Sequence, residues 1–143
     1  MPVSGAAPLS ARRLRAWIAS FELALDISHL TRQAALNGPD GSGAAGRRLM
    51  DAAARLPLAL ARAQAAGPQE GASRCLDDAL ACLAEMETHL TLCKCLHWID
   101  AAPLPDFEAR CAALRRELIA LAGAARTLRQ LPKERLNENN SIT

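Results

Sequence analysis

The sequence is poor in the residues that favour β-sheets. It contains no tyrosine, only two phenylalanines and two tryptophans, and aromatic residues make up 3% of its 143 positions. β-branched residues are also scarce, whereas alanine and leucine, both strong helix formers, are abundant. A chain of this length has room for one domain with one hydrophobic core. The composition therefore predicts a single all-α domain.

Several other features are missing. No run approaches the roughly eighteen apolar residues that cross a membrane, and residues 1–8 lack the basic start and apolar run of a signal peptide. The chain also lacks any C-x-x-C pair. Its five cysteines are Cys75, Cys82, Cys93, Cys95 and Cys111. Most fall at apolar helical positions, which is typical of reduced, buried thiols in a cytoplasmic protein, and this is the localisation we expect.

Neither sign of charge is in large excess, and no catalytic motif is present. Seventeen basic residues against fifteen acidic ones give a net charge of +2, far below the usual surplus of a dedicated nucleic-acid-binding protein. The sequence has no Ser/His/Asp order, phosphate-binding loop or dinucleotide fingerprint. We therefore expect a protein that is not an enzyme and that needs no cofactor.

Apolar residues recur at helical spacing in segments separated by glycine and proline. The predicted helices cover residues 10–36, 44–66, 69–100 and 106–131. Ser10 and Asp106 are the expected N-terminal caps of the first and last of them. Short connections favour an antiparallel up-down-up-down four-helix bundle over residues 10–131. Residues 1–9 are expected to be flexible, and the polar tail 132–143 to be disordered.

The second and fourth predicted helices each carry one apolar seam. In the second, the seam consists of Leu49, Ala53, Leu56, Leu60 and Ala63. Pro57 lies inside this segment, where a proline costs roughly 3 kcal/mol, so the helix is either kinked or split into two. In the fourth, the seam consists of Phe107, Cys111, Leu114, Leu118, Leu121, Ala125 and Leu128. Its unbroken four-three spacing is typical of bundle packing.

The first and third predicted helices carry two apolar stripes each. In the first, one stripe holds Leu14, Trp17, Ile18, Phe21 and Leu25, and the other holds Leu23, Ile27 and Leu30. In the third, the leucines lie on one face and Cys75, Cys82, Met86 and Cys93 on the next. Apolar surface beyond the needs of one core predicts self-association. The candidate oligomer interface is Leu23, Ile27, Leu30, Cys82, Met86 and Cys93.

Three motifs resemble one known family. The segment 79–92, A-L-A-C-L-A-E-M-E-T-H-L-T-L, resembles the A-L-x-S-L-x-E-L-E-T-Q-L segment of the four helix bundle protein family, first noticed in intervening sequences of ribosomal RNA genes. The segment 52–57, A-A-A-R-L-P, is similar to its A-A-x-S-I-P motif, which includes the interior proline. Trp17 and residues 25–30 sit where the family has V-W-x-x-A-x-x-L. After the proline, A-L-A-R-A at 59–63 departs from the family's N-I-A-E-G.

The resemblance carries expectations for assembly and partners. It implies a four-helix bundle that assembles as a five-subunit ring. One related branch is the accessory variability protein of diversity-generating retroelements, a basic pentamer that binds reverse transcriptase and nucleic acid. Most other members have no established activity. The resemblance therefore implies a homopentamer and leaves nucleic acid or a reverse transcriptase as candidate partners.

Two clusters invite a chemical interpretation, but both are better explained as structural. His89, Cys93 and His97 share one helix face but extend over about 12 Å, too far for one metal ion, so no metal site is predicted. Glu85 and Glu87 lie about 200° apart around the helix and cannot share an acid–base site. A carboxylate there is expected to meet an arginine or cap a helix.

Arginines form the remaining candidate site. Arg48, Arg55 and Arg62 recur every seven residues on the second helix, and Arg115 and Arg126 flank the seam of the fourth. Repeated around a ring of subunits, they could hold phosphates. They could also form a solvated face, since Asp51 precedes Arg55 by four residues, a common surface pair. Two hypotheses follow: an adapter for nucleic acid or a nucleic-acid enzyme, and a structural or protein-interaction module without nucleic-acid contact.

Overall fold

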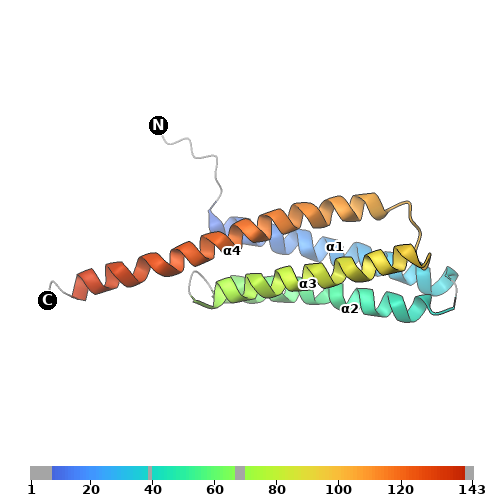
Figure 1. Cartoon of the computed structure of the whole chain (residues 1–143), viewed down its shortest axis with the longest axis horizontal. Coiled ribbons are helices and arrows are strands. Elements are labelled where there is room, and N and C mark those ends of the chain that lie inside the picture. Colours follow the sequence, from blue (N-terminus) through green and yellow to red (C-terminus); the bar gives the residue numbers. More distant parts are fainter. Residues whose placement is uncertain (1–7, 39, 67–69, 141–143) are drawn as a thin grey trace, which may run out of the picture.

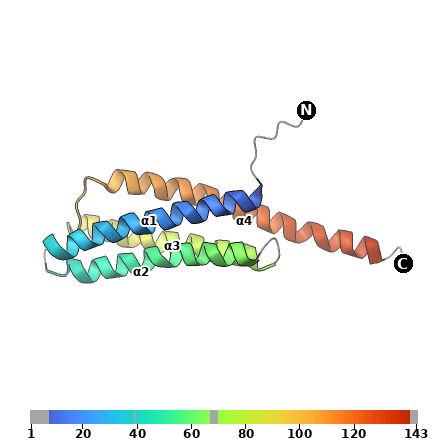
Figure 2. The same ribbon diagram turned by 180° about the vertical axis from the view of Figure 1, so that it is seen from behind.

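A computed structural model describes residues 8–38, 40–66 and 70–140 of the chain. It contains the helices α1 (Leu9–Asn37), α2 (Ser42–Ala66), α3 (Glu70–Cys95) and α4 (Leu104–Asn140). Consecutive helices run antiparallel, and α1 also packs against α4, which closes the bundle (Figures 1 and 2). The all-α, up-down-up-down prediction is confirmed. Within the described ranges, no helix is long and apolar enough to cross a membrane.

The core forms where the predicted seams meet. Every member of the α2 seam is buried, and every member of the α4 seam is buried except Leu128, which is half-buried. Leu49 and Leu56 of α2 and Leu118 of α4 have no exposed surface. α2 is one continuous helix through Pro57, so the alternative of two separate segments is wrong. Packing on both sides of α2 compensates for the hydrogen bond that the proline cannot donate.

The end of α3 differs from the prediction. The helix was expected to reach residue 100 but ends at Cys95. The amide of His97 donates a hydrogen bond to the carbonyl of Lys94 at 3.1 Å, and the amide of Trp98 donates one to the carbonyl of Cys93 at 2.9 Å. The backbone of His97 adopts the left-handed conformation, with a φ of 56°. This is the Schellman ending of a helix, which usually places glycine where His97 lies. Without that glycine, the sequence gives no stop signal.

The outer boundaries also differ from those predicted. α1 begins at Leu9, and its preceding residue Pro8 makes no side-chain cap, so Ser10 lies inside the first turn and is not the cap. α4 begins at Leu104, which places Asp106 in its first turn. α4 also continues to Asn140 and projects past the other helices (Figure 1), so residues 132–140 are helical where disorder was expected. Residues 1–7 and 141–143 lie outside the described residues.

The predicted oligomer interface lies mostly inside a single copy. Leu23, Ile27, Leu30, Met86 and Cys93 are all buried in the core, so the prediction is wrong for these five; Cys82 is half-buried against the same core. Each helix of a closed bundle touches two neighbours and can bury about half of its circumference. The two stripes of α3 therefore merge into one buried face. On α1, the stripe placed in the candidate interface faces the core, and the other stripe, with Leu14, Ile18, Phe21 and Leu25, is the exposed one.

The α4 seam gives a test of the core. Leu118→Ala should lower the free energy of unfolding by roughly 2–5 kcal/mol, because it leaves a cavity among fully buried side chains. Arg116→Ala, at an exposed position of the same helix, should change it by at most about 0.5 kcal/mol. Chemical denaturation followed by circular dichroism measures both. Equal effects would mean that the inner and outer faces of α4 are wrongly assigned.

Candidate functional site

The outer surface of α1 is apolar over three turns. Leu14, Ile18, Phe21 and Leu25 are between 41% and 48% exposed. They follow one another at intervals of four, three and four residues, which places them in one line along the helix. Exposed leucines scattered singly are ordinary, but a contiguous line of large side chains is typical of a docking surface.

α2 extends this surface. Leu58, 57% exposed, lies outside the α2 seam and faces Trp17 and Phe21 across a groove of about 450 Å³ between α1 and α2. Trp17 and Phe21 stack with their ring centroids 5.5 Å apart, and Met50 and Pro57 complete the lining of the groove. We call the α1 line, this groove and Leu58 the apolar face. The α1 stripe was recognised in the sequence, but the candidate interface was placed on the other stripe. Leu58, a leucine off the α2 seam, was a further signal for this face.

In the part of the chain that the structure describes, ion pairs connect each pair of neighbouring helices except α1 and α2, whose contact lies beneath the apolar face. Arg12 bonds Glu117 at 2.9 Å and Arg110 bonds Asp26 at 2.7 Å between α1 and α4. Similar ion pairs join α3 to α2 and to α4. Among the described residues, none joins α1 to α2. The contact between α1 and α2 therefore rests mainly on apolar side chains, with a buried hydrogen bond from the Ser42 hydroxyl to the Ala34 carbonyl at one end, and the apolar side chains continue to the surface.

Three of the five candidate arginines form ion pairs with carboxylates of α3. Arg55 reaches Glu85, Arg115 reaches Glu87, and Arg126 reaches Asp77 at 3.4 Å. Arg48 and Arg62 are exposed and form no ion pair within the described part of the chain. The five do not form one site, because Arg115 and Arg126 of α4 and the α2 arginines flank opposite sides of α3. Their carboxylate partners lower the positive potential available to a phosphate.

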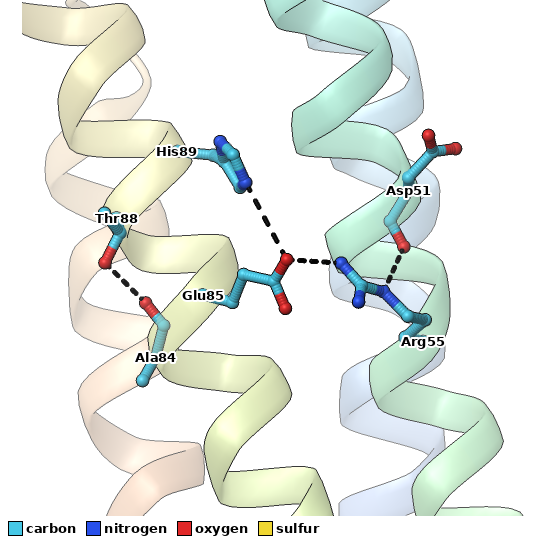
Figure 3. Close-up of polar contacts among 6 residues, drawn as sticks. All are labelled: Asp51, Arg55, Ala84, Glu85, Thr88 and His89. Carbon is cyan, nitrogen blue, oxygen red and sulfur yellow. Dashed lines mark hydrogen bonds and ion pairs between the residues drawn. The ribbon is translucent and has the colours of Figure 1, made fainter.

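The two glutamates of the E-x-E-T motif connect α3 to both of its neighbours. Glu85 accepts a hydrogen bond of 2.5 Å from Arg55 of α2, and the guanidinium of Arg55 also donates to the carbonyl of Asp51 (Figure 3). Glu85 raises the pKa of Arg55 further through this hydrogen bond and its charge. The Nε2 atom of His89 lies 3.9 Å from the same carboxylate. Glu87 points the other way, toward α4, as the predicted angular separation requires.

The histidine and cysteine side chains of α3 do not form a metal site. His97 lies beyond the end of the helix, so the predicted one-face alignment of His89, Cys93 and His97 is not present. In the described ranges, no three histidine, cysteine or acidic side chains come together as metal ligands do. Burial raises the pKa of Cys93, and raises that of Cys111 to about 11. These thiols remain protonated at neutral pH and are poor nucleophiles.

No family model, no curated protein and no solved structure matches this chain. The four-helix bundle that the resemblance implied is present. Membership of the four helix bundle protein family has no support from these comparisons.

Two of the three ion pairs that the described residues form between α3 and α4 give a matched test. One carboxylate oxygen of Glu87 is buried, so Arg115→Ala removes its ion-pair partner and should cost about 1–3 kcal/mol of stability. Arg126→Ala breaks a pair in which both side chains are 55% exposed and should cost at most about 0.5 kcal/mol. Urea unfolding distinguishes the two, and similar losses would show that the Glu87 pair behaves as an ordinary surface pair.

Proposed function

We propose that this chain is a non-enzymatic protein-interaction module that associates with further copies of itself through the apolar face. The observation that carries the proposal is the line of large, exposed apolar side chains on α1, continued by Leu58 of α2. Water contact with such a surface is unfavourable by about 25 cal/mol for each Å². Association removes that surface from water, and a second copy supplies a matching apolar surface without requiring another gene product.

The interaction role fits the rest of the molecule. A common hydrophobic core joins the four helices, with ion pairs at its margins, so the bundle can present the apolar face as a preformed surface. The resemblance implies a ring of five subunits, and the cysteine pattern is typical of a cytoplasmic protein. The charges along the edge of α1 favour a twofold contact instead. Either arrangement would act by assembly and not by chemistry.

A second candidate function is an adapter for nucleic acid or for a nucleic-acid enzyme such as a reverse transcriptase. It is favoured by Arg48 and Arg62, which are exposed on either side of Arg55 along α2. Arg48 and Arg62 are fourteen residues apart, or about 21 Å along the helix axis, and an assembly would repeat the pair in each copy. Against it, three of the five arginines already have carboxylate partners, and stacking aromatics are scarce.

Charged substitutions on the apolar face test the primary proposal. Ile18→Glu combined with Phe21→Glu should convert the wild-type assembly into a species of the 15.2 kDa chain mass, because two carboxylates would have to be buried at the contact. Light scattering measures the mass, and circular dichroism should show unchanged helicity because both side chains are already exposed.

Ile119→Glu is the matched control, since Ile119 is 53% exposed but lies on α4, away from the apolar face. This variant should keep the wild-type mass. A wild-type chain that stays monomeric at micromolar concentration would refute self-association, and loss of assembly in Ile119→Glu would show that the apolar face is wrongly placed.

Nucleic-acid binding is tested at Arg48 and Arg62, the two candidate arginines that form no ion pair within the described part of the chain. An adapter should bind DNA or RNA with an affinity that falls as salt rises, and Arg48→Ala with Arg62→Ala should reduce the salt dependence by about one unit of slope for each lost contact. Arg74→Ala, at an exposed position of α3, serves as the control. Under the primary proposal, fluorescence anisotropy with a labelled oligonucleotide should show only weak binding that neither change affects.

A further inference from the structure

The spacing of the exposed α1 residues specifies the shape of the partner. Intervals of four, three and four place Leu14 and Phe21 at d positions and Ile18 and Leu25 at a positions of a heptad. Ala16 and Leu23 then fall at f positions, opposite this seam, and both are buried in the bundle core. α1 thus carries a second, outward seam across two heptads. Side chains at this spacing pack into the holes of another α-helix, so the partner surface is helical.

The two edges of this seam differ in charge. One edge, the e positions, carries Arg15 and Glu22, both exposed. Within the described residues neither forms an ion pair, although other charged side chains of α1 pair with α4. The other edge, the g positions, carries Trp17 and Ala24, which are uncharged and turn toward α2. The seam therefore has one basic and one acidic group, seven residues apart, along a single edge.

The basic and acidic groups on this edge can attract their counterparts in a second copy only when the two α1 helices run antiparallel. A twofold axis perpendicular to two antiparallel copies of α1 keeps the e edge of one helix beside the e edge of the other. Consider the register that places Leu14 beside Leu25 of the partner subunit and Ile18 beside Phe21 of the partner subunit. In this register, Arg15 and Glu22 of the partner subunit differ in height along the helix axis by about 3 Å. The symmetry forms this ion pair twice. In a parallel arrangement, the charged e edge would face the uncharged g edge.

We infer that two copies of this chain associate through antiparallel α1 helices, with Arg15 of each copy paired to Glu22 of the other. The inference rests on the proposed self-association and adds its orientation and register. Stable protein interfaces bury about 800 Å² on each partner, more than two heptads of one helix supply. The apolar surface of α2 at Leu58, level with Trp17 and Phe21 near the centre of the seam, extends the contact.

Charge reversal tests the pairing. Arg15→Glu alone and Glu22→Arg alone should each weaken the dimer about tenfold or more, because each change converts two attractive contacts into repulsive ones. The double variant, Arg15→Glu with Glu22→Arg, should return the dissociation constant to within about threefold of wild type. An equimolar mixture of the two single variants should form a heterodimer more tightly than either forms a homodimer. Sedimentation equilibrium measures the dissociation constants of the two single variants, the double variant and the heterodimer, each compared with that of the wild type.

Arg116→Glu, an exposed reversal on α4, should leave the dissociation constant unchanged. The expected wild-type mass is twice the 15.2 kDa of one chain. Two results would overturn the antiparallel pairing and leave the proposed function intact. One is self-association of the wild type with no recovery of affinity in the double variant or in the mixture. The other is a wild-type mass of five subunits. A monomeric wild type would overturn both.

Discussion

The structure depends on the burial of one broad apolar face from each helix in a common core. Leu56 of α2, Leu83 of α3 and Leu118 of α4 are fully enclosed at its centre. On α1, this requirement fixes the rotation of the helix about its axis, since only one of its two stripes can face inward. Once Leu23 and Ile27 occupy the core, the opposite stripe must face outward. The exposed apolar face is therefore a direct consequence of how the core is packed.

Electrostatic interactions act at the margins of that core. On α3, Glu85 points toward α2 and Glu87 points toward α4. The two glutamates of the E-x-E-T motif therefore form ion pairs with both neighbouring helices. Individual surface ion pairs stabilise a protein little. Their larger effect is on the surface that remains available, because they occupy arginines that could otherwise hold phosphates. In the described part of the chain, no ion pair joins α1 to α2. The chain therefore presents apolar surface more clearly than it presents a basic site.

The E-x-E-T segment also separates fold from function. Its glutamates make structural contacts within one copy, so a chain with this motif can adopt the bundle whatever it binds. The features that bear on partners, Ile18, Phe21 and Leu58, lie elsewhere. Similarity in the motif thus predicts the architecture, while the outward surfaces of α1 and α2 must specify the partner.

The sequence by itself determined the helix number, the order and the seams of α2 and α4, because helical periodicity is a local property. It could not show where α3 ends, because His97 adopts a backbone conformation in which glycine is usual. Nor could it rank two equally apolar stripes on α1, or show that the Arg55 guanidinium meets Glu85 thirty residues away. Only the tertiary structure decided these points, because each depends on which neighbouring helix covers which side.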